Sequence, residues 1–477
     1  MRTPVYTILL LSGFTLAACS LTPTYQRPAA PLPAQWSAAA DTPPAAANAA
    51  AVPGSNWQDF VRDDGLRQLI DQALANNREL RIALLQVESA RALYGIQRAD
   101  RLPGLELDAS GQRQRLPADL NASAASSVQS SYQVGLGLTA FELDLFGRLR
   151  NLSAAAEEEY LATAENAQPA RISLISEVMR GWVLRNSAWQ QRQLAEQTQQ
   201  TRQRSLSLIQ HRQRVGLAST IDLQEARGLT EQAEVDVERA RRALAQTEHA
   251  LQLLLGDGAA LPPVAPSTAV PFATITPGLP ADLLTQRPDI RAAEHQLRAR
   301  NASIGAARAA FFPSISLTGL FGTASSELSG LFDSGQRSWN FMPQLRLPIF
   351  SGGRNQANLE LATVRQDIAI ADYEKTIQTA FREVNDALVV NATLQREEAA
   401  LRARLDAGQQ RLRLAEARYR AGVDDHLRYL DAQRDDYANQ AEFIHVQGQR
   451  QLAQISLFRV LGGGLPGALE GALEGAR

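Results

Sequence analysis

The chain has 477 residues, a formal net charge of −2 and 6% aromatic residues. A nearly balanced charge, with no basic stripe interleaved with aromatic residues, argues against a nucleic-acid partner. The length allows two or three ordinary domains, and a composition rich in Ala, Leu, Gln and Arg favours long helices over a compact mixed core.

The first 18 residues have the form of a secretory signal peptide. Arg2 supplies a positive start, residues 6–16 are apolar, and the sequence Leu-Ala-Ala leads to Cys19. This ending resembles a bacterial lipobox, after which the cysteine becomes a lipid-bearing N-terminus; an ordinary signal peptide is the alternative. Residues 19–56 are rich in Pro and Ala and are expected to form an extended, lipid-anchored segment.

Four segments show the alternation of apolar and polar residues that is typical of β-strands. They lie at about residues 104–114, 131–145, 314–322 and 338–350. Strands of about ten residues with one apolar face fit a membrane barrel, and no later stretch approaches the ~18 apolar residues of a transmembrane helix. A soluble antiparallel sheet is the alternative. Four strands cannot close a barrel, and lipid does not tolerate an open sheet edge, so the membrane interpretation requires an oligomer.

Very long helices follow each pair of strands. In the second half, apolar or small residues recur at alternating spacings of four and three from Tyr373 through Ile377 and Ala380 to Tyr419. This seven-residue period predicts left-handed coiled-coil packing. The helix from 354 to 420 would be on the order of 100 Å long at ~1.5 Å per residue.

The order helix, strand, strand, long helix, tight turn, helix occurs twice. Gly95 and Pro103 of the first half return as Gly305 and Pro313 in similar surroundings. Residues 57–260 and 261–464 are therefore expected to be two equivalent structural repeats, and residues 465–477 a flexible tail.

Gly216 and Gly422 mark the two tight turns, because glycine suits the left-handed position just after a helix end. The segment 219–222 has the form of a capping box that opens the helix after the first turn. The second turn has Asp425 but carries Arg428 where the matching carboxylate would stand, so its cap is expected to be asymmetric.

The sequence shows no catalytic or metal-binding constellation. Its five histidines lack a metal-ligand spacing, no nucleophile elbow or phosphate loop is present, and the single cysteine is Cys19. The chain is therefore predicted not to be an enzyme and to carry no cofactor apart from a covalent lipid on Cys19.

Asp431 and Arg434 lie one helical turn apart, shortly after the second tight turn. The simple interpretation is an exposed surface pair of little energetic value. In an oligomeric tube the same carboxylate would recur around the axis and form a ring that constricts and selects. Asp222 is the candidate for the equivalent level in the first half.

Several segments together resemble one family. They are Cys19–Pro28 (CSLTPTYQRP), Phe141–Arg148 (FELDLFGR), Arg287–Ile290 (RPDI), Ile304–Pro313 (IGAARAAFFP), Tyr419–Val423 (YRAGV) and Leu430–Arg434 (LDAQR). They resemble the outer-membrane factors of tripartite efflux systems, the TolC-like family, and within it the OprM-like outer-membrane lipoprotein branch.

The resemblance implies an α+β membrane protein. Three chains with four strands each would form one twelve-stranded β-barrel in the outer membrane, continued by a long periplasmic α-helical barrel with an equatorial domain. The implied function is a passive exit duct for antibiotics, dyes, detergents and solvents. The implied partners are two further copies in a homotrimer, outer-membrane lipids, a periplasmic adaptor (membrane fusion) protein and an inner-membrane, proton-driven pump of the RND type.

The resemblance also assigns residues to sites. Leu427, Asp431 and Arg434 match the leucine, aspartate and arginine that line the closed periplasmic end in the OprM-like branch, whereas Asp222 and Tyr419 match TolC-like gate residues. Arg428 stands where that gate has a second aspartate, which departs from a double acidic ring. The two turns expected to contact the adaptor consist of Val215, Gly216 and Leu217, and of Ala421, Gly422 and Val423.

Two alternatives remain open from the sequence. A periplasmic lipoprotein adaptor also has a lipid anchor, a helical hairpin and strands, but it needs neither four long strands with an apolar face nor an internal repeat. A coiled-coil envelope scaffold without a pore does not account for the alternating strands. The expected location is the outer membrane, with lipid anchoring and a large periplasmic portion.

Overall fold

The computed structural model describes residues 21–31, 33, 36, 56–117, 127–256, 260–264, 271–275 and 283–463. Cys19, the predicted signal peptide, most of the predicted extended segment and the predicted tail at 465–477 lie outside these residues. The helices and strands, in chain order, are α2 (Trp57–Phe60), α3 (Asp64–Asn76), α4 (Arg78–Ala99), β1 (Leu105–Leu116), β2 (Ser127–Leu143), α5 (Arg148–Arg214), α6 (Thr220–Leu255), α7 (Leu283–Gln286), α8 (Pro288–Ala309), β3 (Ser314–Ser325), the short 3₁₀ helix η6 (Leu328–Gly330), β4 (Arg337–Arg346), α9 (Arg354–Arg420) and α10 (His426–Val460).

The chain divides into two compact units. Unit 1 consists of Met1–Ala29, Gln86–Ala164 and Ala292–Glu374 and contains the four strands. Unit 2 consists of Ala30–Leu85, Glu165–Arg291 and Lys375–Arg477. It contains the part of each helical hairpin, α5–α6 and α9–α10, that includes the turn.

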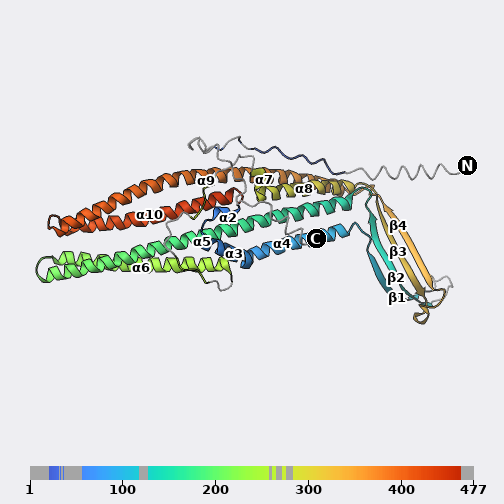
Figure 1. The fold of residues 1–477 in the computed structure, drawn as a ribbon. Helices are drawn as coiled ribbons and strands as arrows, with labels where there is room; N and C mark the ends of the chain where they lie inside the picture. The colour runs from blue at the N-terminus through green and yellow to red at the C-terminus, as the bar shows by residue number, and fades with distance from the viewer. Residues whose placement is uncertain are drawn as a thin grey trace. The chain divides into compact units, whose positions relative to one another are not determined.

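In unit 1 the strands form one antiparallel sheet in the order β1-β2-β3-β4 (Figure 1). Within the described part of the chain, β1 and β4 each pair on one side and are therefore the two edges of the sheet. A mostly helical chain with a single four-stranded sheet confirms the predicted α+β class.

The register places apolar side chains on one face of the sheet. Leu107, Leu136, Phe321 and Trp339 are successive partners across all four strands, and each is more than half exposed. Directly paired residues of antiparallel strands project from the same face. One row further along β1, the opposite face carries Asp108, so this sheet has an apolar face and a polar face, as the alternation predicted.

Two strands end earlier than the sequence suggested. β2 ends at Leu143 rather than at about 145, and Gly147, with a φ of 74°, redirects the backbone into α5. β4 ends at Arg346 rather than at about 350, so residues 347–350 lie beyond the strand. The ladder stops there because Arg346 pairs with Ser314, the first residue of β3.

The described N-terminal segment lies along α8 within unit 1. Asn301 donates a hydrogen bond to the carbonyl of Pro23 (2.9 Å), and Arg308 donates one to the carbonyl of Leu21 (3.1 Å). Arg308 is next to the last residue of α8, shortly before β3 begins. The segment is therefore held at Leu21, two residues after Cys19, beside the junction between α8 and β3.

A single carboxylate also holds this segment. Glu294 of α8 is almost completely buried and forms ion pairs with Arg27 of the segment and with Arg298 of its own helix, the latter at 2.7 Å. Tyr25 donates a further hydrogen bond to the same carboxylate (3.3 Å). Burial by itself raises the pKa of Glu294, but the hydrogen bond from Arg27 and the charges of both arginines outweigh it and lower the pKa below its ordinary value.

The main apolar core lies in unit 2, where α2 and α3 pack against α5, α6 and α10. Phe60 stacks on Phe272 with ring centroids 5.0 Å apart and on Phe458 at 4.6 Å, and all three are fully buried with Trp57. These rings belong to segments far apart in the sequence, so the core fixes the bases of the two hairpins relative to each other.

The seven-residue pattern of α9 is confirmed by burial. Every residue of the predicted seam is buried or half-buried; these are Tyr373, Ile377, Ala380, Val384, Ala387, Asn391, Leu394, Leu401, Leu405, Gly408, Leu412, Ala415 and Tyr419. The polar member, Asn391, donates across the hairpin to the carbonyl of Ala453 on α10 (3.0 Å). Among the described helices, none combines the length and the hydropathy that crossing a membrane requires.

Candidate functional site

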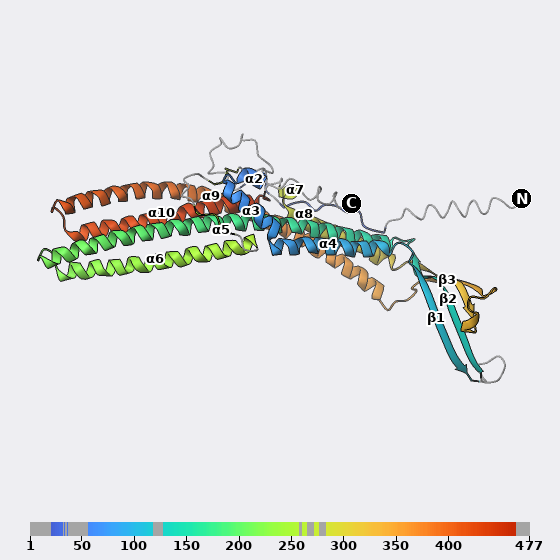
Figure 2. The ribbon, with the colours of Figure 1, turned by 60° about the horizontal axis from the view of Figure 1, so that its bottom comes forward.

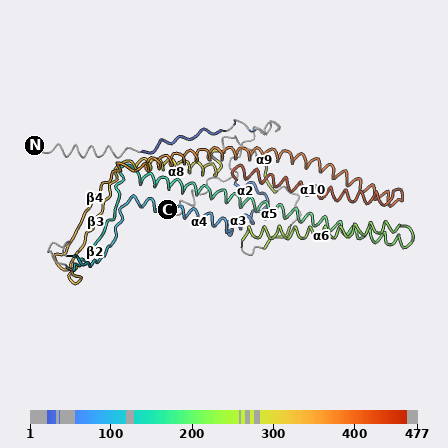
Figure 3. The backbone as a smooth tube through the Cα atoms, turned by 180° about the vertical axis from the view of Figure 1, so that it is seen from behind, coloured from blue at the N-terminus to red at the C-terminus, as the bar shows by residue number. Residues whose placement is uncertain are grey.

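The two hairpins of unit 2 turn at the same end of that unit (Figures 2 and 3). At the first turn, Leu217 N–H donates to the carbonyl of Arg212 (2.7 Å) and Gly216 N–H to that of Gln213 (3.1 Å). At the second turn, Val423 N–H donates to the carbonyl of Arg418 (3.0 Å) and Gly422 N–H to that of Tyr419 (3.1 Å). Both are Schellman motifs, and both need a glycine because φ is 78° at Gly216 and 72° at Gly422.

The helices that leave the turns are capped differently, as the sequence predicted. Ser219 and Asp222 form a complete capping box, in which each side chain accepts the backbone N–H of the other. In α10, Asp425 accepts the N–H of Arg428 (3.1 Å), and the arginine cannot return the bond to the cap. The hydrogen bond from the Ser219 N–H is the main cause that lowers the pKa of Asp222.

The side chains around the turns present apolar groups to solvent. Among the six residues predicted to contact an adaptor, Val215, Leu217 and Val423 are each more than 60% exposed. Next to Val423, Asp424 closes the second turn through a bidentate ion pair with Arg418, with atoms 2.7 and 3.0 Å apart. A rigid turn with exposed apolar tips is suited to contact with another protein.

A cluster of aromatic and charged side chains joins the two hairpins just behind the turns. Arg212 of α5 donates to the hydroxyl of Tyr419 on α9, with Nη1 2.6 Å from Oη. The Tyr419 ring stacks on Tyr429 of α10 at 5.5 Å between centroids and meets the His426 ring at 5.2 Å. We call Arg212, Tyr419, His426 and Tyr429 the hairpin cluster.

The hairpin cluster has unusual electrostatics. His426 is half-buried, and its Nδ1 is buried without a hydrogen-bond partner among the described residues. Burial lowers the pKa of His426; Asp222 on the other hairpin opposes that shift and Arg212 adds to it. Asp222 therefore interacts with this cluster through its charge while its oxygens cap α6.

Further along the hairpins, Arg202 of α5 donates to the side-chain oxygen of Gln433 on α10 (2.6 Å), and both residues are buried. Burial lowers the pKa of this arginine, so the hydrogen bond offsets part of the cost of placing its charge there. Gln191 of α5 donates to the carbonyl of Ala441 on α10 at 2.9 Å. These bonds attach α5 to α10 over the stretch from Gln191 to Arg202.

The other three predicted gate residues lie on an exposed stripe of α10. Leu427 is 56% exposed, and Asp431 and Arg434 form an ion pair with Oδ1 3.2 Å from Nη2. The side chains of this pair are 49% and 68% exposed. The structure thus brings Tyr419 and Asp222 together around His426 and leaves Leu427, Asp431 and Arg434 facing away from the hairpin cluster.

Sequence reasoning missed three residues of this region: Arg212, His426 and Tyr429. His426 was noted only as one of the histidines without metal-ligand spacing. A usable signal was present, because Arg212 lies four residues before Gly216 much as Tyr419 lies three before Gly422. Within the described chain, no group of His, Cys, Asp and Glu side chains could hold a metal ion.

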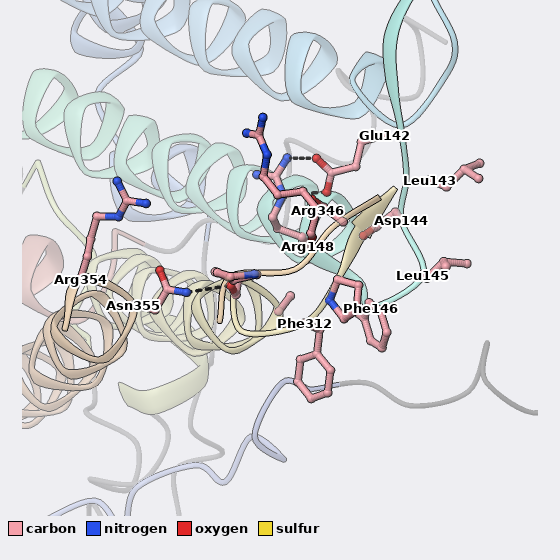
Figure 4. A pocket seen from close by; sticks show the side chains of 15 residues that line it. Glu142, Leu143, Asp144, Leu145, Phe146, Arg148, Phe312, Arg346, Arg354 and Asn355 are labelled. Atoms are coloured by element: carbon pink, nitrogen blue, oxygen red, sulfur yellow. Dashed lines mark hydrogen bonds and ion pairs between the residues drawn. The ribbon is translucent and has the colours of Figure 1, made fainter. Parts of the chain in front are cut away.

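A second site, in unit 1, is a cavity of about 220 Å³ where the strands meet the helices (Figure 4). Glu142 accepts two hydrogen bonds from Arg148, at 2.8 and 2.5 Å, and Phe146 stacks on Phe312 at 4.8 Å. The Asn355 side chain donates a hydrogen bond to the backbone carbonyl of Ala310, just after α8, at 2.9 Å. These contacts bind the ends of β2, α8 and α9 together, and the lining has no nucleophile with a neighbouring base.

Comparison with known proteins identifies the family. The model of the family "Outer membrane efflux protein" matches residues 69–257 and 279–463. The chain is 54% identical to the outer membrane protein OprJ of Pseudomonas aeruginosa and 45% identical to the solvent efflux pump outer membrane protein SrpC of Pseudomonas putida, with 97% of each chain covered in both cases.

Solved structures agree with this result. A membrane protein from Pseudomonas aeruginosa superposes with a TM-score of 0.87 at 53% identity, covering 93% of this chain and all of the other. The open state of the MtrE outer membrane channel of Neisseria gonorrhoeae gives 0.84 at 37% identity, over 94% of this chain and 99% of the other. The chain therefore belongs to the outer membrane efflux protein family, whose members are transport proteins rather than enzymes, as the sequence predicted.

Proposed function

We propose that the chain is the exit duct of a tripartite, RND-type efflux pump and works as a trimer in the outer membrane. The observation that carries this proposal is the sheet of unit 1. It has one apolar face, one polar face and two edges without a partner strand among the described residues. In lipid every strand edge must be paired, and three such sheets joined edge to edge would make a closed barrel of twelve strands.

The helical hairpins supply the second part of the proposal. Their turns would face the periplasm and contact the adaptor through the apolar tips at Val215, Leu217 and Val423. Leu427, Asp431 and Arg434 would line the periplasmic entrance, where three copies of Asp431 form a ring. The exposure of this stripe in the single chain supports the assignment, because a residue that lines a channel must be accessible.

Lipid anchoring at Cys19 is also part of the proposal. The segment that follows Cys19 is held beside the junction of α8 and β3, at the level where the barrel would leave the membrane. An acyl chain on this cysteine would then enter the inner leaflet of the outer membrane without further chain length. The barrel itself would provide the main membrane attachment.

The cargo follows from relatives of similar length. Proteins that are 45% and 42% identical to this chain are named as parts of solvent, toluene and antibiotic efflux pumps. A duct without a chemical step suits such a mixture, because it needs only a wide polar lumen and a gate. We propose apolar solvents and antibiotics as the transported compounds.

Single-channel conductance tests the proposal most directly. Purified wild-type protein in planar bilayers is expected to give small, mostly closed channels, and Asp431→Ala is expected to give larger or more frequently open ones. Glu442→Ala is the matched control, because Glu442 is an exposed carboxylate further along the same helix. An Asp431→Ala variant indistinguishable from wild type would place the constriction elsewhere.

Extraction separates the duct from an adaptor or a scaffold. A barrel needs detergent for release from the membrane even when Cys19→Ser removes the lipid. Release of that variant by salt or alkaline buffer alone would show that the lipid was the only attachment and would rule out the barrel.

A further inference from the structure

The apolar face of the sheet carries charge at one end only. Arg113 and Arg115 of β1 pair with Ser130 and Val128 of β2, and Arg337 of β4 pairs with Thr323 of β3. Because the register is continuous through these pairs, all three arginines project from the face that holds Leu107, Leu136, Phe321 and Trp339.

All three lie towards the same end of their strands, although the register places Arg337 in the row of Ala109, four residues before Arg113. Arg113 and Arg115 lie near the end of β1, and Arg337 is the first residue of β4. This is the end of the sheet away from the helices, since α4 leads into the start of β1 and α9 follows the end of β4. We call these three residues the arginine end of the apolar face.

Among the residues of the four strands, no carboxylate lies on the same face as these arginines. The acidic residues of the strands are Glu106, Asp108 and Glu142; the first two lie on the polar face of β1, and Glu142 pairs with Arg148 at the other end of the sheet. All three arginines are exposed, and no ion pair or hydrogen bond joins their guanidinium groups to another described side chain. Three positive charges therefore lie at one end of this face, beyond the rows of Leu107 and Trp339.

An arginine on a lipid-facing barrel surface is costly at the bilayer centre and tolerated near the headgroups. The arginine end thus marks one headgroup level. The aromatic residues agree with this position, because Trp339 lies two residues from Arg337 on the same face and the Tyr132 ring covers Gly111 beside Arg113. At the end of the sheet near the helices, this face carries Leu105 and Leu345 and no charged strand residue.

We propose that the arginine end binds the phosphate groups of a phosphorylated glycolipid of the outer leaflet, the lipid A part of lipopolysaccharide. Guanidinium groups bind phosphate oxygens in a bidentate manner, which suits a site that must be fixed by charge on an open surface. Arg113 and Arg115 lie two residues apart on one strand, about 7 Å, so they can engage one phosphorylated headgroup together. Acyl chains of the same molecule would cover the apolar rows towards Leu107 and Trp339.

This inference rests on the proposed function in one respect: helices in the periplasm place the arginine end in the outer leaflet. The proposed barrel also strengthens the site. β1 and β4 are the two edges of the sheet, so closure from several copies would place β1 of one copy next to β4 of another, with the arginines of both strands towards the same end of the barrel. Each seam between copies would then hold one glycolipid.

The test is lipid binding to detergent-purified protein, measured by native mass spectrometry. The probes are bisphosphorylated lipid A, the same lipid A with both phosphates removed, and phosphatidylglycerol. The variant combines Arg113→Gln, Arg115→Gln and Arg337→Gln, and its matched control is Arg346→Gln, which removes a positive charge from the polar face of β4. Wild type and control should bind bisphosphorylated lipid A at least about ten-fold more tightly than the triple variant.

Two results would overturn the inference. One is equal binding of bisphosphorylated and dephosphorylated lipid A by the wild type, a comparison that remains valid if the triple variant does not fold. The other is phosphatidylglycerol bound by the wild type as tightly as lipid A, since any phospholipid headgroup would then suffice. Conductance of the same wild-type preparation separates the two proposals: channels without phosphate-dependent binding refute only the lipid site, and absence of channels refutes the duct.

Discussion

Arg212 and Tyr419 connect the two helical hairpins through one hydrogen bond, with Nη1 2.6 Å from the phenol oxygen. The guanidinium group also lies 5.5 Å from the centre of the tyrosine ring. Tyr419 belongs to the residues that the family resemblance assigns to the gate, whereas Arg212 belongs to the other structural half. Movement of one hairpin away from the other must break this bond, so the pair is suited to hold the closed state.

Removing the bond should favour the open channel. A hydrogen bond to a charged group contributes about 1–2 kcal/mol at a half-exposed site, so Tyr419→Phe should raise the open probability about five-fold or more. Arg212→Gln should act similarly, and the double variant should add little to either single change because both remove the same contact. Open probability in planar bilayers measures all three. Arg214→Gln, an exposed arginine of the same turn, is the control; full additivity in the double variant would contradict the assignment.

His426 should make the closure of the hairpins dependent on pH. The groups that act on it are Arg202 and Arg212 of α5, Asp222 and Glu225 of α6, Tyr419 of α9 and Tyr429 of α10. Burial lowers the pKa of His426 below its ordinary value of 6.5, so the folded cluster binds its proton less readily than the separated chain does. The stabilisation that the cluster gives to the closed hairpins is therefore complete above pH 6.5 and declines as the pH falls below that value.

The measurement is open probability at pH 7.5 and at pH 5.5. Wild type should open more at the lower pH, and His426→Gln should lose most of that difference. His211→Gln, at an exposed histidine of α5, should keep the wild-type response. If His426→Gln retains the full response to pH, another group controls it.

The N-terminal segment should be released when the charge of Glu294 is removed. Glu294→Gln leaves Arg27 and Arg298 without their carboxylate, and a loss of about 1–2 kcal/mol is expected because both arginine side chains are 40–45% exposed. Thermal unfolding and the rate of proteolysis within residues 21–31 measure the effect. Glu159→Gln, which breaks the exposed pair with Arg300, should change the free energy of unfolding by no more than about 0.5 kcal/mol and leave the rate of proteolysis unchanged. If residues 21–31 resist proteolysis equally in both variants, the hydrogen bonds to the carbonyls of Leu21 and Pro23 are sufficient to hold the segment.

Several features of this fold could be predicted because local chemistry decides them. The turns at Gly216 and Gly422 follow from the need for a positive φ, and the seam of α9 follows from a seven-residue period that a single helix must satisfy. The capping box at Ser219 is equally local. In each case the residues concerned are close together in the sequence.

The missed features depend on how distant segments approach each other. The bond between Arg212 and Tyr419 depends on how α5 lies against α9, which the periodicity of either helix leaves open. The half-buried position of His426 arises only when both hairpins are assembled. The arginine end of the apolar face could have been suspected from the alternation in β1, but Arg337 joins it only through the register of β3 with β4.

The close approach of Gly135 and Gly322 gives a prediction for the sheet itself. They are partners between β2 and β3 on the polar face, and a Cβ at residue 322 would lie 2.0 Å from the carbonyl oxygen of Val134 and 2.4 Å from the Cα of Gly135. Both neighbours are backbone atoms, so Gly322→Ala must separate the strands, at a cost of about 1–3 kcal/mol or more.

Gly137→Ala is the matched control, because it adds the same methyl group to the same face of the sheet, on β2, where the nearest atom is 3.6 Å away. Thermal unfolding of the detergent-purified proteins should therefore show a lower midpoint for Gly322→Ala. For Gly137→Ala the free energy of unfolding should stay within about 0.5 kcal/mol of the wild-type value. Equal stability of the two variants would mean that the paired strands can move apart without loss. Since the same strands would form the barrel wall, Gly322→Ala should also reduce the yield of channels in bilayers.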